Sequence, residues 1–157
     1  MKIGNHLEPL DDDSIVLRFV ISQNQFDHID ANAFTLSTAE KEHDPSRISV
    51  WENSITPLQL AKQFVTNPKR DLVIELNVGD IRALGDDANH EPFGLDVKWD
   101  YLEDCLDITS NKLLPNATEG YEGHAGIFGL NPKEKLLRKK IRDKLTELAN
   151  RSMFYKV

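Results

Sequence analysis

Apolar and polar positions along the chain form segments that predict five strands. Residues 14–22 (SIVLRFVIS) carry apolar or β-branched side chains toward both faces, which is typical of a central strand covered on both sides. Residues 47–52 (RISVWE) form a second apolar run. Residues 71–78 and 94–101 alternate apolar with polar positions, which predicts strands with one buried face. A fifth, short strand is expected at 124–130 (HAGIFGL).

Two segments have the spacing of amphipathic helices. The first is expected at 57–66, with Thr56 as its N-cap and Pro57 in its first turn. The second is expected at 132–150, where Asn131 precedes the helix as its cap. The apolar positions on one side of that helix are Leu137, Ile141, Leu145 and Leu148.

Strands outnumber helices, which argues against an alternating βαβ array and predicts an α+β fold. We expect a mixed or antiparallel sheet of about five strands, packed against the helices at 57–66 and 132–150. The length of 157 residues predicts a single domain, 1–157. The other segments are interpreted as an extended lead-in (1–13), a polar loop (37–46) and a long loop (103–123).

Composition narrows the class of protein. The chain has one cysteine, Cys105, which excludes an internal disulfide and a cysteine-based zinc site. The first residues, MKIGNHLEPLDDD, lack the apolar segment of a signal peptide. No apolar run approaches the roughly 18 residues of a membrane span. We therefore expect a cytoplasmic protein that does not enter a membrane.

Charge is distributed unevenly along the chain. Residues 1–131 carry 10 Lys and Arg against 23 Asp and Glu, while residues 132–157 carry 9 against 3, for a net charge of −7. One interpretation is a basic helical face that binds a protein partner, or nucleic acid through helix 132–151 alone. The other is a solvated surface attracted to the acidic body of its own chain. The partner-binding candidates are Lys135, Arg138, Lys139 and Arg142.

The stretch NATEGYEGHAGIFGLNPKEK combines four glycines with one histidine. Its glycine spacing matches neither G-x-G-x-x-G nor a P-loop. His124 stands between small residues, and its near-neutral pKa range suits acid–base chemistry, although an ordinary packed histidine has the same neighbours. Gly129 and Lys133 lie at the start of the second helix, where free N–H groups favour an anion. The alternative there is a turn followed by solvated lysines.

Arg18 interrupts the strand that we expect to be covered on both faces. A buried arginine needs a counter-charge, so it either pairs with Glu75 or Glu52 or points into a ligand pocket. The polar loops at 27–30 and 86–91 contain metal-ligand residue types without the spacing of a zinc or calcium site. We therefore expect neither a metal nor a cofactor.

Several segments carry a resemblance to known families. The segments LRFV, ANAF, RISVWE, LVIELNVGDIRALG and GHAGIFGL cover most of residues 14–131. They resemble an uncharacterised family of small bacterial proteins with N-A-F, I-S-V and H-A-x-I-x-G segments. Their order is similar to that of ADP-ribosyltransferase-like folds. The resemblance implies that Arg18 and Ser49 match motif positions on the first two strands, with His124 where such families have a glutamate.

Two functional hypotheses follow. The first is a small soluble bacterial accessory protein that binds a protein partner within a larger assembly, compatible with a defence or toxin-related system. The second is an enzyme acting on a nucleotide such as NAD, with Arg18 on phosphate, Ser49 on ribose and His124 as acid, base or stacking group. A pocket joining these three residues would favour the enzyme. Internal pairing of Arg18, with His124 on a separate surface, would favour the accessory protein.

Overall fold

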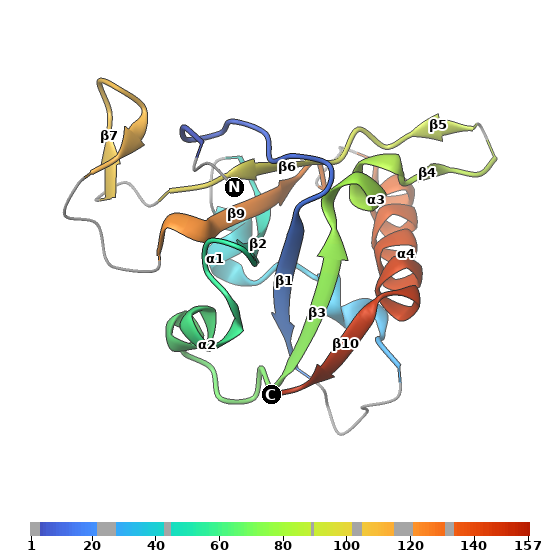
Figure 1. Ribbon diagram of the computed structural model, residues 1–157. Coiled ribbons are helices and arrows are strands. Elements are labelled where there is room, and N and C mark those ends of the chain that lie inside the picture. The colour runs from blue at the N-terminus through green and yellow to red at the C-terminus, as the bar shows by residue number, and fades with distance from the viewer. Residues whose placement is uncertain are drawn as a thin grey trace.

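Six strands form one antiparallel sheet, which confirms the α+β class. The computed structural model describes residues 4–21, 28–42, 45–88, 90–101, 105–114, 121–130 and 134–157. The strands of the sheet are β1 (Ile15–Val20), β2 (Arg47–Glu52), β3 (Leu72–Asn77), β6 (Asp96–Trp99), β9 (His124–Phe128) and β10 (Met153–Lys156). Their order is β10-β3-β1-β2-β9-β6, with antiparallel pairing throughout (Figure 1).

Both faces of the sheet are covered, because β1 is apolar on both sides. Val16 and Leu17 point to opposite faces and are 0% and 1% exposed. The helix α4 (Lys135–Arg151) packs its apolar stripe on the Val16 side. Trp51 and Tyr121 pack with Leu17 on the other side. The prediction of a central strand covered on both faces is confirmed.

Short helices and two hairpins connect these strands. The helices are α1 (Thr38–Glu42), α2 (Leu58–Ala61), α3 (Val78–Ala83) and the 3-10 turns η1 (Ala31–Phe34), η2 (Lys62–Phe64) and η4 (Tyr121–Gly123). One hairpin is formed by β4 (Gly85–Asp86) and β5 (Glu91–Pro92), and the other by β7 (Leu106–Asp107) and β8 (Lys112–Leu113).

The expected first helix is shorter than predicted, and Thr56 does not cap it. The α-helix ends at Ala61 and continues only as the 3-10 turn η2 to Phe64. The residue at the N-cap is Pro57, which has no side chain able to cap. Thr56 is instead fully buried, and its hydroxyl accepts a hydrogen bond of 2.9 Å from the backbone N–H of Gly123. The Thr56 side chain, which the sequence pattern predicted as a helix cap, therefore makes a tertiary hydrogen bond instead.

The second helix is present, and a strand that the sequence analysis missed follows it. The helix runs from Lys135 to Arg151 with Glu134 at its N-cap, so it begins three residues later than predicted. The predicted cap, Asn131, lies outside the described residues and is not the N-cap of this helix. After Ser152 the chain turns back as β10 and pairs with β3 along Met153–Lys156. This edge strand is the sixth strand of a sheet for which about five were expected. Only Ser152 separates it from the helix, so the sequence shows no separate alternation of apolar and polar residues for this strand.

Three segments interpreted as irregular contain structure. Residues 37–46 include α1, and residues 103–123 include the β7–β8 hairpin and η4. The lead-in 1–13 packs on β6, since Leu10 is 3% exposed and its N–H donates to the carbonyl of Val97 at 2.9 Å. The interpretation of residues 37–46 and 103–123 as loops was wrong in those parts.

The sheet opens between β1 and β2. Strand β1 pairs with β3 along its whole length, from Ile15 to Val20. It pairs with β2 only at Val16 and Leu17. Beyond that point the two strands diverge, and in Figure 1 β9 and β6 run across the direction of β1 and β3. The opening exposes backbone groups of β2 that a continuous sheet would have paired.

Candidate functional site

An ion pair between Arg18 and Glu40 fills the opening between β1 and β2. The Nη1 atom of Arg18 lies 2.8 Å from Oε2 of Glu40. The same nitrogen donates to the Ser49 carbonyl at 3.2 Å, and the Ser49 N–H donates to Glu40 Oε2 at 2.7 Å. The two side chains therefore bind the backbone groups of Ser49, as a neighbouring strand would. Without them the opened strand would leave these groups unsatisfied.

The partner of Arg18 was predicted incorrectly. Glu52 is not the partner, because its carboxylate accepts from Ser54 and Ile55 in its own turn. Glu40 comes from α1, within the segment interpreted as a polar loop. Ser37 and Glu40 form a reciprocal capping box, in which each side chain accepts from the other residue's backbone N–H. The pattern S-x-x-E at 37–40 was the local signal that could have located this helix and its glutamate.

The pKa values of Arg18 and Glu40 depend on their burial and on each other's charge. Burial lowers the pKa of the Arg18 guanidinium, although the charge of Glu40 acts in the opposite sense. Burial alone would raise the pKa of Glu40. The charge of Arg18 and the amides of Ser37 and Ser49 outweigh that effect, so the pKa of Glu40 lies below its ordinary value. The carboxylate is therefore ionised at neutral pH.

Ser49 and His124 are joined by a short hydrogen bond. Ser49 Oγ lies 2.6 Å from Nε2 of His124, and Nδ1 of the same ring lies 2.6 Å from the Asp100 carbonyl. A carbonyl oxygen only accepts, so in the neutral ring Nδ1 carries the proton. Nε2 is then the acceptor, and the Ser49 hydroxyl donates to it. His124 therefore holds the Ser49 hydroxyl in one orientation.

Aromatic rings fix the plane of His124. The Tyr121 ring stacks on the imidazole with centroids 5.1 Å apart, and the Trp51 ring meets it edge-on at 4.7 Å. The ring is 4% exposed. Behind it, the Asp100 carboxylate lies 3.6 Å from Nδ1 and 2.5 Å from Nε of Arg47. One carboxylate oxygen of Asp100 thus contacts both the imidazole and the guanidinium.

A glycine makes room for this arrangement. Gly126 lies opposite Ser49 in the β2–β9 register. A Cβ atom at this position would lie 2.9–3.1 Å from side-chain carbons of Arg47. Only glycine lets the Arg47 side chain cross β9 toward Asp100 without a shift of one of them. The I-S-V and H-A-G segments of the sequence thus meet side by side in the structure.

Arg18, Glu40 and Ser49 border a cleft of about 460 Å³ that opens at the divergence of β1 and β2. Three arginines line it, namely Arg18, Arg47 and Arg70. The first two pair with carboxylates, whereas Arg70 has no carboxylate partner among the described residues and donates to the Phe19 carbonyl at 3.0 Å. The remaining lining residues are Phe19, Ser37, Glu40, Ser49, Trp51, Phe64, Val65, Thr66 and Asn67. The cleft combines a positive end with an aromatic wall, in a chain of net charge −7.

The predicted partner-binding residues lie on α4, but they do not form one free basic face. Lys139 pairs with Asp143 at 3.1 Å within the helix. Arg138 and Arg142 line a separate cleft of about 400 Å³ on another side of α4. Lys135 is exposed in the first turn. Lys140 also bonds to the acidic body, at Asp86 (3.2 Å), which supports the interpretation of attraction within the chain.

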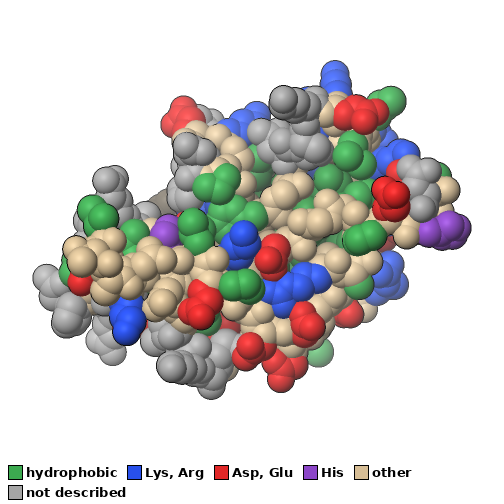
Figure 2. All heavy atoms as spheres, turned by 90° about the horizontal axis from the view of Figure 1, so that it is seen from above, with side chains coloured by type: hydrophobic (Ala, Val, Ile, Leu, Met, Phe, Trp, Pro, Cys, Tyr) green, Lys and Arg blue, Asp and Glu red, His purple; other side chains and the backbone are tan. Residues whose placement is uncertain are grey.

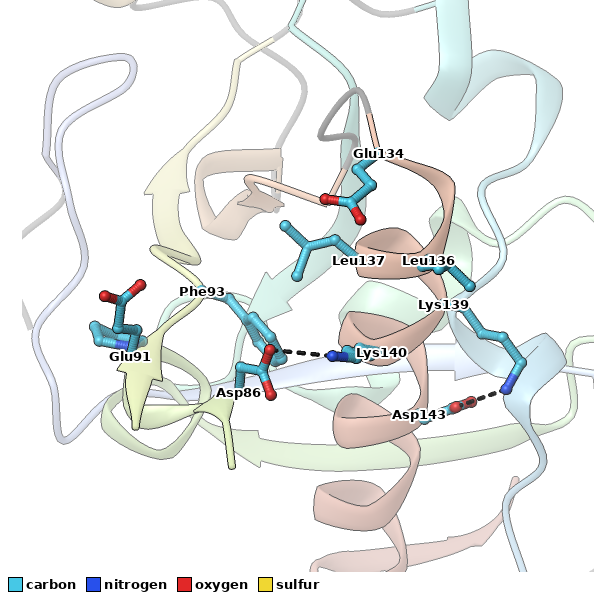
Figure 3. A pocket seen from close by; sticks show the side chains of 10 residues that line it. Asp86, Glu91, Phe93, Glu134, Leu136, Leu137, Lys139, Lys140 and Asp143 are labelled. Atoms are coloured by element: carbon cyan, nitrogen blue, oxygen red, sulfur yellow. Dashed lines mark hydrogen bonds and ion pairs between the residues drawn. The ribbon is translucent and has the colours of Figure 1, made fainter. Parts of the chain in front are cut away.

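A groove of about 500 Å³ separates the start of α4 from the β4–β5 hairpin (Figure 3). Phe93 and Leu137 lie between the hairpin and α4, whereas Leu136 lies on the side of α4 away from the hairpin. Leu136 is 69% exposed, which is unusual for a leucine beside other apolar side chains. Glu91 and Glu134 on its rim have no basic partner among the described residues. On the face shown in Figure 2, acidic side chains also gather along one edge.

The remaining sequence candidates are the anion site at the start of the second helix and the polar loops with metal-ligand residue types. Lys133 of the expected anion site lies outside the described residues, and Gly129 adopts a positive φ of 95°, as a turn glycine does. Within the described ranges no group of three His, Cys, Asp or Glu side chains is placed to hold a metal ion. Among the helices that the structure describes, none has the length and apolar character to cross a membrane.

Comparison with known proteins yields no relative. No protein-family model, curated protein or solved structure matches the chain. The similarity to ADP-ribosyltransferase-like folds therefore stays a prediction from the motifs.

Proposed function

We propose that the cleft binds a phosphate-bearing nucleotide and that the protein is an enzyme acting on it. The observation that carries this proposal is the convergence of Arg18, Ser49 and His124 in one place. Arg18 and Ser49 line the cleft, and His124 is hydrogen-bonded to Ser49. Arg18 is paired internally, as the accessory-protein hypothesis expected, but His124 does not lie on a separate surface.

The charge of the cleft supports an anionic ligand. Three guanidinium groups face two carboxylates, Glu40 and Asp100, so the site retains a positive charge. Arg70 is half-buried, and its charge reaches Arg18, whose pKa it helps to lower. Arginine suits phosphate because its planar fork of donors matches the phosphate oxygens.

The shape of the cleft supports a ligand that also has a flat apolar part. Phe64 and Trp51 stack with centroids 4.9 Å apart, and both line the cleft beside Val65. A volume of about 460 Å³ lies in the range of small-molecule sites. A nucleotide base against this wall would leave its phosphates at the arginines. Orthophosphate alone would use only half of the site.

Thermal unfolding in the presence of ADP, NAD and orthophosphate tests this proposal. A ligand that binds only the native state, at about 100 times its dissociation constant, adds about 2.7 kcal/mol. We expect this shift with ADP or NAD, and a much smaller one for Arg70→Gln. Arg151→Gln, at an exposed arginine of α4, is the matched control and should retain the shift. No stabilisation by any nucleotide, or equal loss in both variants, would contradict the proposal.

The groove beside α4 supports a second candidate function, that of a cytoplasmic accessory protein binding a protein partner. Its exposed Leu136 and its unpaired rim carboxylates, Glu91 and Glu134, fit a peptide with an apolar side chain between lysines or arginines. We expect Leu136→Glu to abolish binding of such peptides on an array and Leu114→Ala, outside the groove, to leave it intact. Equal binding by both variants would contradict this function.

A further inference from the structure

We propose that Ser49 is a nucleophile toward a phosphate ester and that His124 is its general base. This inference rests on the proposed phosphate site and adds the reaction that would occur there. The observation behind it is the geometry of the Ser49 and His124 side chains, which are hydrogen-bonded to each other. The serine hydroxyl already donates to an imidazole nitrogen at 2.6 Å. That is the contact through which a histidine removes a proton from a serine.

The tautomer of His124 is the one that this role requires. Nδ1 donates to the Asp100 carbonyl at 2.6 Å, which leaves the lone pair of Nε2 directed at Ser49. The stacked Tyr121 ring and the edge of Trp51 prevent the imidazole from rotating out of this plane. The base is therefore oriented before any substrate arrives.

Asp100 is the positioning residue of this arrangement. Its backbone carbonyl fixes the Nδ1 proton, and its buried carboxylate lies 3.6 Å from the same nitrogen. When the serine proton reaches Nε2, the resulting imidazolium has a negative charge beside it. Arg47 bonds to that carboxylate at 2.5 Å, and the same arginine lines the cleft next to Ser49.

The cleft indicates a phosphorus electrophile. Arg18, Arg47 and Arg70 line the same cleft as Ser49. Negative charge on phosphoryl oxygens is what guanidinium groups stabilise during phosphoryl transfer. A neutral ester or amide would leave Arg70, which has no carboxylate partner among the described residues, without an anionic ligand. The structure thus combines a nucleophile, an oriented base and the cations that a phosphate ester requires.

The reaction balances with water as the only added reactant. Ser49 Oγ bonds to phosphorus while its proton passes to His124 Nε2. The bond from phosphorus to the leaving oxygen breaks, and His124 returns the proton to that oxygen. Water then attacks the phosphoserine ester, again with His124 taking its proton, and Ser49 Oγ leaves with that proton. The net result is hydrolysis of one phosphate ester bond.

The chromogenic diester bis(4-nitrophenyl) phosphate tests this inference without a nucleotide. We expect nitrophenolate release together with a phosphoryl adduct located at Ser49 by peptide mass spectrometry. Ser49→Ala should abolish both, and His124→Asn should slow release on the order of 10²- to 10⁴-fold. Ser110→Ala, at an exposed serine of the β7–β8 turn, should match the unmodified protein. Unfolding midpoints of all variants establish that each is folded.

The positioning role of Asp100 has its own readout. In Asp100→Asn the imidazolium loses its neighbouring charge, so the pH of half-maximal release should move to lower pH. A uniform fall in rate with an unchanged pH profile would indicate a structural role only.

The outcomes separate this inference from the proposed function. Absence of both release and adduct, or equal release in folded Ser49→Ala, overturns the nucleophile. An adduct at Ser49 without nucleotide stabilisation supports the nucleophile and contradicts the nucleotide. Nucleotide stabilisation without any reaction of the diester leaves a binding site and overturns the serine chemistry.

Discussion

Replacing Glu40 by glutamine removes the counter-charge of a buried arginine and keeps the side chain nearly the same size. Arg18 is 4% exposed and would then have no carboxylate within the opening of the sheet. Breaking a buried ion pair from one side costs about 3–5 kcal/mol, because the remaining charge stays buried. Native proteins have only about 5–15 kcal/mol of stability, so this loss is a large fraction of the total.

The size of the effect follows from the contacts of the carboxylate. Glu40 accepts from Arg18 and from the amides of Ser37 and Ser49, at 2.7–2.9 Å. Glutamine keeps one acceptor oxygen, but its NH₂ group would face at least one of these N–H groups, and two donors cannot form a hydrogen bond with each other. At roughly 2–4 °C per kcal/mol for a chain of this size, we expect the melting temperature to fall by about 6–20 °C.

Thermal and urea unfolding measure this change, with two comparisons. The double variant Arg18→Met with Glu40→Leu should be more stable than Glu40→Gln, since it leaves no unpaired charge. Asp143→Asn breaks the exposed pair with Lys139 and should cost only about 0.3–0.5 kcal/mol. A loss below about 1 kcal/mol for Glu40→Gln would refute the reasoning that this pair replaces a neighbouring strand.

Three further predictions concern the same region. Because folding lowers the pKa of Glu40, its ionised carboxylate stabilises the protein above the unfolded-state pKa of about 4.3. This stabilisation is lost as the pH falls through the pKa of the folded state. The stability of Glu40→Gln should therefore depend less on pH than that of the unmodified protein in this acidic range. Gly126→Ala should cost about 1–3 kcal/mol in urea unfolding, because the added methyl meets Arg47, and equal stability would contradict the crossing of β9. Thr56→Val leaves the buried N–H of Gly123 without its hydroxyl acceptor and should cost about 1–3 kcal/mol of stability. If Thr56 only capped α2, the loss of stability would be smaller, and the Gly123 amide would stay protected from hydrogen exchange.

The pattern of apolar residues along the sequence predicted where the strands lie better than it predicted which residues they contact. Residues 47–52 form β2 with the predicted bounds, and β1 lies within the predicted 14–22. These strands are long apolar runs, in which burial dictates the residue type. The edge strand β10 was missed because its side chains are half-exposed and it follows α4 almost directly.

The site was predicted in part. The need of Arg18 for a carboxylate follows from burial alone, but the choice of Glu40 depends on where β1 and β2 diverge, which is a property of register and twist. Ser49 and His124 were candidates through the resemblance and the glycine-rich context, respectively. Their hydrogen bond depends on the pairing of β2 with β9, at Ser49 opposite Gly126. The contacts of Asp100 with His124 and Arg47 were missed, because a residue directly after a strand carries no local signal of its partners.

A nitrogen–proton NMR titration of the labelled protein with ADP shows directly whether the cleft between β1 and β2 binds a nucleotide. We expect the shifts to concentrate at the Ser49 amide, at residues 64–67 and at the Arg70 Nε–H, and to saturate together. Arg151 at the end of α4 should not respond. Shifts confined to α4 and the β4–β5 hairpin, or none at all with ADP, would contradict the nucleotide site between β1 and β2.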